Sequence, residues 1–411
     1  MEVLDDVDIL SWLEKEEPKA PAFPVKSAHA DTLTSQEIVG TSFEIQREIL
    51  LVLLEKAISV VPTRNMIPVL TNFQLKVTEG KLEVIASSLD MAIVVSTNQV
   101  DTKIPGTEVL PAKTLLTIVK EANAGSTIFI EVSTTGAVIV AGGFSAEIRI
   151  MNGSDFPPMD ILDNVVFHEV QRQAFIDAIT NVKYALPGKD HSGLDTLRMI
   201  HIRGGKFTAC DGSRFQQVRV EDFKLSMQLP TYSINTIIKT LSSTDQEILE
   251  IGETKGRLVF RLNNVIFYVN KLDDPYPKVE QLWLRPALSN DQEFIVNRQE
   301  LITAIKQVKV ASDSSSNAIG LIIENEFVKI VAKDIENSAS VVIPCKWTGK
   351  PKTLAVNYLH LVEMLKAYSL PECRFLLGKD TQTHKASILL KNDDTMAIAT
   401  IPQMLAYRVG L

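Results

Sequence analysis

The residues best suited to chemistry are Asp211, Ser213 and Arg214, which lie close together in the segment ACDGSRF. A carboxylate beside a hydroxyl could belong to a nucleophilic site, but such a site also needs a positioned base. The six histidines are scattered along the chain, and we expect His201 to be a structural residue on a strand. The sequence has no phosphate-binding loop, zinc-protease motif or nucleophile elbow. We therefore expect that the protein is not an enzyme.

Metal and redox chemistry find no support either. Cys210, Cys345 and Cys373 lack the paired spacing of a zinc site, and their odd number does not suggest a disulfide framework. The apolar run at residues 49–54 is far too short to span a bilayer, and no signal peptide is recognisable. We expect no metal, no cofactor, no membrane association and a cytoplasmic location.

Lysine and arginine residues recur at corresponding places in the predicted helices. Lys113 and Lys120 share the face opposite the apolar residues Leu115 and Val119. We count eleven basic and six acidic residues on the six predicted helices, whereas the whole chain has a net charge of -8. A basic face on an acidic body suits sequence-independent contact with phosphates, although solvation alone would explain any single lysine. The recurring residues are Lys120, Lys239 and Lys366, then Arg172 with Lys183, and Arg298 with Lys306 and Lys309.

These helices belong to a unit that occurs three times. The segment LPAKTLLTIVK recurs as LPTYSINTIIK and as VNYLHLVEMLK. A second similar segment, predicted to form the first helix of each unit, recurs around Arg47, Arg172 and Arg298. A repeat of about 120 residues matches the commonest domain size. Each unit closes on an apolar residue before proline, at Phe156-Pro157, Tyr276-Pro277 and Ile401-Pro402.

The pattern of elements predicts an α+β fold. Alternating runs such as TIFIEV, RLVFRL and MAIAT follow the second helix of each unit, and turns such as Gly204-Gly205 join further strands. We predict three tandem domains, each with two helices on an antiparallel sheet, at residues 41–160, 161–287 and 288–411. Residues 1–40 are predicted to be a flexible tail that is acidic and rich in proline.

Several segments resemble the bacterial DNA polymerase III beta subunit, the replication sliding clamp, over essentially all of residues 41–411. They are TRNMIPVLTNFQLKV, FPPMD, ACDGSRF, the Tyr276-Pro277 run and IPQML. The resemblance implies a head-to-tail homodimer that closes into a six-domain ring around duplex DNA, with helices inside and sheets outside. A ring of twelve helices about 10 Å apart measures about 38 Å across, whereas six helices would leave no room for a duplex. We therefore expect a dimer.

The resemblance also implies two sets of functional residues. Arg64 matches a loop arginine that contacts DNA, Lys183 matches a basic residue near DNA, and the helix faces add Lys120, Lys239, Lys306 and Lys309. A groove would bind short peptides of polymerase, clamp loader and repair proteins, although its apolar members could also be ordinary core residues. This partner-peptide pocket would comprise Leu197, Cys210, Gly212, Arg214, Phe215, Pro277, Leu282, Ala399 and Ile401.

The sequence departs from the family in several places. Ser213 replaces the usual histidine and Phe215 the usual leucine, so the pocket is expected to be reshaped. The chain also continues through Met404, Tyr407 and Arg408, and it begins with the extra tail. In that tail, residues 9–13 (ILSWL) resemble the apolar end of peptides that dock in clamp pockets, although an acidic tail with a few incidental apolar residues is the favoured interpretation. A clamp-like paralogue or decoy, which binds replication partners without encircling DNA, remains the alternative function.

Overall fold

The computed structural model describes residues 39–63, 66–151, 153–159, 162, 164–188, 195–272, 274–284, 292–377, 386–391 and 395–401. Residues 1–38, Arg64 and the C-terminal residues Met404, Tyr407 and Arg408 lie outside these ranges, so the expectations for them are not addressed. Within the described residues, one order of elements occurs three times.

The first repeat contains two helices and nine strands. They are β1 (Val39–Gln46), α1 (Arg47–Ala57), β2 (Asn72–Thr78), β3 (Lys81–Ser87), β4 (Met91–Thr97), β5 (Asp101–Ile104), β6 (Gly106–Pro111), α2 (Ala112–Glu121), β7 (Thr127–Ser133), β8 (Ala137–Ala141) and β9 (Phe144–Ile148). The strand β7 alternates between buried and less buried residues, as expected when one face of a sheet is covered.

The second repeat follows the same order without an equivalent of β5. Its elements are β10 (His168–Gln171), α3 (Arg172–Val182), β11 (Met199–Arg203), β12 (Lys206–Cys210), β13 (Arg214–Arg219), β14 (Met227–Pro230), α4 (Thr231–Leu241), β15 (Ile248–Glu253), β16 (Arg257–Leu262) and β17 (Val265–Asn270). A short helical segment, Glu280–Leu284, follows this repeat.

Both helices of the third repeat begin at a clear sequence signal. Asn297 and Asn357 cap α6 and α7, because each side-chain oxygen accepts hydrogen bonds from two backbone N–H groups of its helix. The elements are β18 (Gln292–Asn297), α6 (Arg298–Val308), β19 (Ala318–Ile323), β20 (Phe327–Lys333), β21 (Ser338–Pro344), β22 (Lys346–Trp347), β23 (Lys352–Asn357), α7 (Tyr358–Ala367), β24 (Glu372–Leu377), β25 (Ala386–Lys391) and β26 (Thr395–Ile401).

The strands form sheets that continue from one repeat into the next. An eight-stranded sheet has the order β10-β15-β16-β17-β4-β3-β2-β6, and a nine-stranded sheet has the order β14-β11-β12-β13-β26-β25-β24-β18-β22. The antiparallel α+β fold is therefore confirmed, but the sheets are not confined to single repeats as the sequence suggested. The remaining strands form a five-stranded sheet, β5-β1-β7-β8-β9, and a four-stranded sheet, β21-β20-β19-β23.

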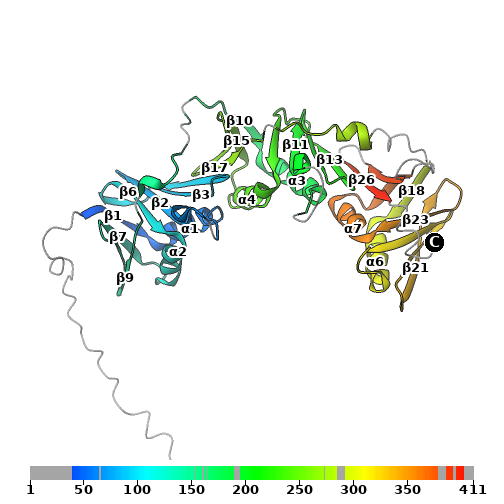
Figure 1. Ribbon diagram of the computed structural model, residues 1–411, viewed down its shortest axis with the longest axis horizontal. Helices are drawn as coiled ribbons and strands as arrows, with labels where there is room; N and C mark the ends of the chain where they lie inside the picture. Colours follow the sequence, from blue (N-terminus) through cyan, green and yellow to red (C-terminus); the bar gives the residue numbers. More distant parts are fainter. Residues whose placement is uncertain are drawn as a thin grey trace, which may run out of the picture.

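The repeats are arranged as an arch (Figure 1). The helices lie along its concave side, strands such as β10, β15, β11 and β13 lie along its convex side, and β9 and β21 lie near its two ends. All described strand pairs within these sheets are antiparallel. This arrangement separates a helical surface from a sheet surface along the whole chain.

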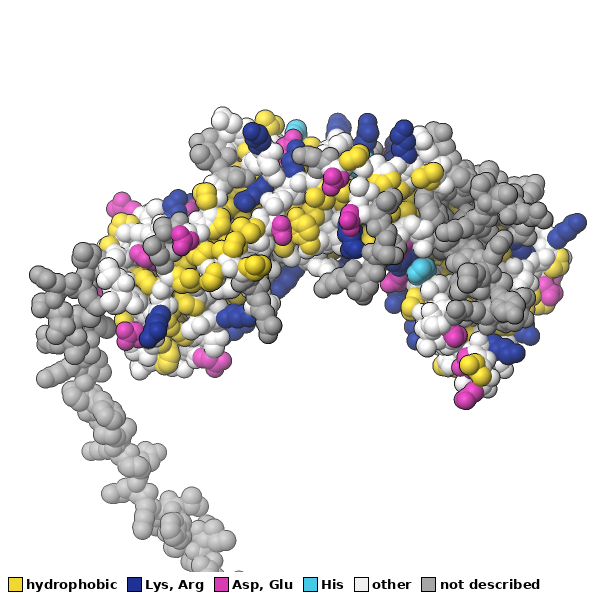
Figure 2. All heavy atoms as spheres, in the orientation of Figure 1, with side chains coloured by type: hydrophobic (Ala, Val, Ile, Leu, Met, Phe, Trp, Pro, Cys, Tyr) yellow, Lys and Arg dark blue, Asp and Glu magenta, His cyan; other side chains and the backbone are white. Residues whose placement is uncertain are grey.

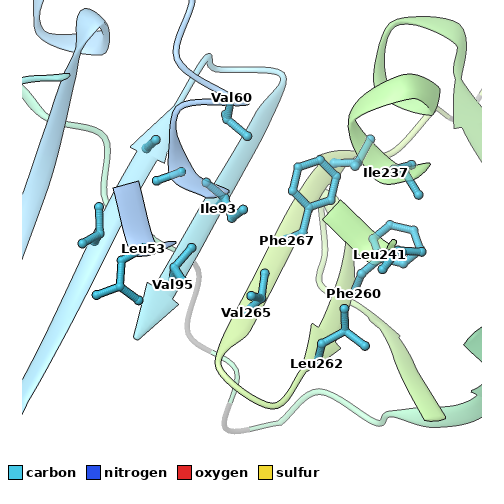
Figure 3. Packing of buried hydrophobic residues seen from close by; sticks show 14 of the residues in the cluster. Leu53, Val60, Ile93, Val95, Ile237, Leu241, Phe260, Leu262, Val265 and Phe267 are labelled. Atoms are coloured by element: carbon cyan, nitrogen blue, oxygen red, sulfur yellow. The ribbon is translucent and has the colours of Figure 1, made fainter. Parts of the chain in front are cut away.

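The apolar core reflects the same connections. One buried cluster runs through the first two repeats, and Figure 3 shows its side chains on both sides of the β4–β17 junction, among them Ile93, Val95, Val265 and Phe267. The third repeat has its own cluster, which includes Phe294 and Phe375. The second and third repeats are therefore joined through the β13–β26 pairing, polar contacts and a small separate apolar cluster, rather than by one continuous core.

Candidate functional site

The segment ACDGSRF forms a tight turn between β12 and β13. The Asp211 carboxylate is nearly buried and accepts hydrogen bonds of 2.7 Å from the backbone N–H groups of both Ser213 and Arg214. Gly212 has a φ of 85°, a left-handed conformation that glycine adopts at little cost. Asp211 and Gly212 therefore build the turn, and this explains the motif without a catalytic role.

Arg214 joins this turn to the third repeat. Its Nε donates to Asp211 Oδ2 at 2.8 Å, and its Nη1 forms an ion pair with Glu363 of α7. The guanidinium carbon also lies 5.8 Å from the centroid of the Tyr184 ring. The side chain is thus held between the two repeats, and its role in the peptide pocket stays a prediction.

A chain of hydrogen bonds extends this contact toward the helices. The Tyr184 hydroxyl donates to Gln216 Oε1 at 2.8 Å, and Gln216 Nε2 in turn donates to Asn181 Oδ1. Asn181 Nδ2 donates to the backbone oxygen of Ala367, at the end of α7. Burial raises the pKa of Tyr184, so the phenol keeps its proton and serves as a donor. The polar network therefore fixes α3 and β13 against α7.

A small apolar cluster lies beside the turn, on the face of the sheet opposite the helices. It brings together Leu197, Cys210 and Phe215, three of the expected pocket residues, with the additional residues Val279 and Leu389. Leu197 is 6% exposed, and Cys210 and Phe215 are fully buried. Burial raises the pKa of the Cys210 thiol to about 11, so it remains protonated near neutral pH. We call this group the apolar cluster.

The other expected pocket residues have different positions. Pro277 lines a cavity of about 510 Å³ next to the apolar cluster, and Leu282 is 68% exposed and lies outside the cluster. Ala399 lies opposite Arg214 in the β13–β26 pairing, and Ile401 lies opposite Ala386. The side chains of Ala399 and Ile401 lie outside the described residues.

Sequence reasoning missed Val279, Leu389 and Tyr276, which pack in or against the apolar cluster. A signal was present for Val279 and Tyr276, because they flank the Pro277 that the family resemblance singles out. For Leu389 the only signal was the apolar run ASILL, which predicts a buried strand but not its neighbours.

The predicted basic residues lie on or beside the helices. Lys183, Lys239, Lys306 and Lys309 are exposed, and Lys120 is exposed as well but lies 3.1 Å from the Glu55 carboxylate. Lys183 and Lys309 occupy the turns that follow α3 and α6. Arg64 lies outside the described residues.

The recurring arginines of the opening helices do not belong to an exposed basic face, which corrects the sequence interpretation. Arg47 donates to the backbone oxygens of Val119 and Lys120, at the end of α2. Arg172 donates to that of Leu241 at the end of α4, and Arg298 to that of Leu365 near the end of α7. The last carbonyls of a helix lack intrahelical partners and carry partial negative charge, so a partly buried cation stabilises them.

Two further observations bear on the kind of site. The described residues contain no group of three or more histidine, cysteine or acidic side chains that could hold a metal ion. None of the described helices combines the length and apolar character needed to cross a membrane.

Comparisons with known proteins agree with this architecture. Residues 41–160 match the family described as DNA polymerase III beta subunit, N-terminal domain. The beta sliding clamp of Pseudomonas aeruginosa is 26% identical over 380 residues, covering 88% of this chain and all of that protein. The beta sliding clamp of Synechococcus elongatus is 24% identical over 339 residues, covering 78% of this chain and 88% of that protein.

The chain is similar to these sliding clamps over most of its length, at 24% and 26% identity. A crystal structure of the Pseudomonas aeruginosa subunit superimposes with a TM-score of 0.80 at 22% identity, covering 88% of this chain and 99% of that chain. A Bartonella birtlesii sliding clamp, solved with griselimycin bound, gives a TM-score of 0.80 at 22% identity and covers 88% of this chain and 100% of that chain. The beta subunit fold therefore extends well beyond the 120 residues of the matched N-terminal domain.

Proposed function

We propose that this chain is a DNA sliding clamp: two copies close head to tail into a ring around duplex DNA and hold a replicative polymerase through its peptides. The observation that carries the proposal is a strand junction between repeats. It forms twice within the chain, and each end of the arch presents one unpaired strand that corresponds to one half of the same junction. The domains would be residues 41–160, 161–287 and 288–411, preceded by the tail. The protein would act in the cytoplasm, on the nucleoid, as a scaffold and not as an enzyme.

The two internal junctions have the same register. In the first, Val265 of β17 lies opposite Val95 of β4, and in the second, Thr395 of β26 lies opposite Val218 of β13. Each receiving strand, β4 or β13, follows a hairpin turn in which one backbone N–H bonds to the carbonyl three residues later, at Ser88 and at Asp211. Val95 lies as many residues after Ser88 as Val218 lies after Asp211, so the two valines occupy equivalent positions.

The ends of the arch carry a third pair of equivalent strands. Asp334 forms the same backbone turn before β21, so Val341 of β21 corresponds to Val95 and Val218. Phe144 begins β9 after a two-residue turn, as Val265 begins β17. The repeat therefore predicts that Phe144 of one copy lies opposite Val341 of another, and Ser145 opposite Ser340.

Each end strand has one unpaired edge and exposed apolar residues, as expected for half of a junction whose partner strand is absent. Among the described strands, β9 pairs with β8 alone and β21 with β20 alone. Phe144 is 50% exposed and Val342 is 56% exposed, in contrast to the buried Val95 and Val265 of the first internal junction. An unpaired edge with exposed apolar residues favours association with another strand. Two copies satisfy both edges in a closed ring.

The concave side suits DNA. In a closed ring the helices would face the centre, where the exposed Lys183, Lys239, Lys306 and Lys309 would meet phosphates. Phosphate contacts carry no sequence information and therefore permit movement along the duplex. Partner peptides would bind on the sheet face at the apolar cluster, where leucine and aromatic side chains find apolar neighbours.

Retention on circular DNA tests the proposal. The protein is loaded by a bacterial clamp loader onto nicked circular DNA, separated from free protein, and examined before and after the circle is cut once. A ring stays on the circle and slides off the linear ends, so cutting should release it. Equal retention on both forms would contradict encirclement, and it would instead support a paralogue that binds partners without encircling DNA. Labelling the protein before loading allows the same sample to be followed throughout.

A further inference from the structure

The convex face of the second repeat carries a hollow that basic, other polar and apolar residues line together. His201, Arg203 and Thr208 come from the β11–β12 hairpin, and Tyr276, Lys278 and Glu280 come from the segment that follows the repeat. The cavity holds about 510 Å³ and shares Tyr276 and Val279 with the surroundings of the apolar cluster. Figure 2 shows basic side chains gathered along this edge of the molecule, over β11 and β13.

A second hollow continues the first. It holds about 520 Å³, shares His201 and Arg203 with the first cavity, and adds Gln228 and Lys271. Because the two hollows share these residues, we refer to them together as the convex groove. Two adjacent hollows with a mixed lining suit an extended chain segment better than a compact small molecule.

Cations in the convex groove outnumber acids. Arg203 lies directly opposite Lys206 in the β11–β12 pairing, and like charges in that position repel each other. Lys206 lies 3.4 Å from Glu280, and Lys271 lies 3.1 Å from Glu253. Within the described part of the chain, Arg203 and Lys278 have no ion-pair partner, so an acidic ligand would relieve the repulsion.

The groove also contains buried polar atoms without partners. Among the described residues, His201 Nδ1, Gln228 Oε1 and the Tyr276 hydroxyl are buried and form no hydrogen bond. The His201 and Tyr276 rings stack with their centroids 4.6 Å apart. Burial and the nearby Arg203 lower the pKa of His201, so its ring is neutral near pH 7. Such orphaned groups are costly unless a ligand or water satisfies them.

The unpaired atoms indicate what kind of ligand would fit. Gln228 Oε1 can only accept a hydrogen bond, the Tyr276 hydroxyl can donate, and Arg203 and Lys278 attract carboxylates. A bare inorganic anion would leave Gln228 Oε1 unpaired. A peptide offers backbone N–H groups, backbone carbonyls and, if acidic, carboxylates, and so can satisfy all of them.

We propose that the convex groove is a docking site for an acidic peptide segment, and that its occupant is residues 1–17 of this protein. That segment contains seven acidic residues and one lysine, which complements the unpaired cations of the groove, and Trp12 and Leu13 supply apolar contacts. Residues 18–38 separate it from β1 and can extend to roughly 70 Å, whereas a domain of this size is roughly 35 Å across. Docking would place acidic residues beside the apolar cluster and so reduce the access of partner peptides to it.

Photo-cross-linking of the full-length chain tests this proposal. Trp12 is replaced by a benzophenone amino acid, the protein is irradiated, and the cross-linked peptides are mapped by mass spectrometry. We expect adducts within residues 199–208, 226–228, 271–272 or 274–281, in the same or another copy. Their yield should fall about tenfold in the double variant Arg203→Glu with Lys278→Glu, because two attractive charges become repulsive.

Two matched controls make the outcome decisive. The double variant Lys329→Glu with Lys333→Glu also reverses two charges, at exposed residues of β20 in the third repeat, and should leave the yield unchanged. Asp5, Asp6 and Asp8 replaced together by asparagine should lower the yield, as should about 0.5 M salt, which screens exposed charges. Adducts at Leu197 or Phe215 only, adducts elsewhere, no adducts, or a yield insensitive to Arg203 and Lys278 would each overturn the proposal.

Discussion

Arg214 on β13 and Glu363 on α7 form an ion pair that connects the turn beside the apolar cluster to a helix of the next repeat. The same guanidinium holds the nearly buried Asp211 carboxylate, whose side chain is 7% exposed, whereas that of Glu363 is 46% exposed. The two acids therefore depend on Arg214 to different degrees. A buried carboxylate loses more than an exposed one when its cation is removed.

This difference predicts unequal effects of two substitutions. Arg214→Ala should lower the free energy of unfolding by about 2–3 kcal/mol, because Asp211 keeps its two backbone hydrogen bonds but loses its counter-charge. Glu363→Ala should cost less than about 1 kcal/mol, since water already reaches that carboxylate. Denaturant unfolding of both variants measures the two values, and a larger loss for Glu363→Ala would contradict the assignment.

The repeated junction predicts a covalent dimer. If Ser145 of one copy lies opposite Ser340 of the other, cysteines at both positions will have Cα atoms roughly 4.5–5.5 Å apart, which a disulfide can bridge. Oxidation of the double variant should therefore give a dimer on a non-reducing gel. Cysteines at Ser145 and Val342, two residues out of register, and each single cysteine variant serve as controls. If the shifted pair reacts as well as the predicted pair, the register is wrong.

Two basic residues of α6 should behave in opposite ways. Arg298→Ala should lower the free energy of unfolding by about 1–2 kcal/mol, because it removes the cation that binds the α7 carbonyl of Leu365, and it should leave DNA binding nearly unchanged. Lys306→Ala should leave stability within about 0.5 kcal/mol and reduce the salt dependence of DNA binding by about one unit of slope. Unfolding and salt titrations on the same preparations separate the two roles. Loss of DNA affinity in Arg298→Ala alone would contradict them.

The buried Cys210 thiol predicts a dependence of stability on alkaline pH. Its pKa is raised from 9.0 to about 11, so above pH 9 the unfolded chain releases this proton before the folded chain does. The contribution of Cys210 is therefore fully present below about pH 9 and is lost as the pH rises toward 11. The decline in melting temperature over this range should be shallower in Cys210→Ala than in the unsubstituted protein. Equal slopes for Cys210→Ala and the unsubstituted protein would refute the prediction.

Local sequence patterns were sufficient to predict the helices, the strands and their threefold repetition. Leu115 and Val119 recur at helical spacing and are buried on α2, and strands such as β7 alternate as expected. The turn at Gly212 required glycine, since its φ is positive. Such signals operate over a few residues, where backbone preferences and the burial of one face decide the conformation.

Contacts between distant elements could not be predicted in this way. The recurrence of Arg47, Arg172 and Arg298 was visible in the sequence, but only the folded chain directs them to the carbonyls of the second helices. The ion pair between Arg214 and Glu363 likewise had no local signal, because it forms where α7 packs beside β13.

The sequence by itself determined a triplicated α+β chain with six helices, the turn at Asp211, and the resemblance to sliding clamps. Only the tertiary structure decided that β17 continues into β4 and β26 into β13, that the helices line a concave side, and that His201, Arg203 and Tyr276 meet in one groove. The physical reason is that periodicity specifies which face of a strand or helix is buried, whereas strand partners and side-chain neighbours depend on the packing of segments far apart in the chain.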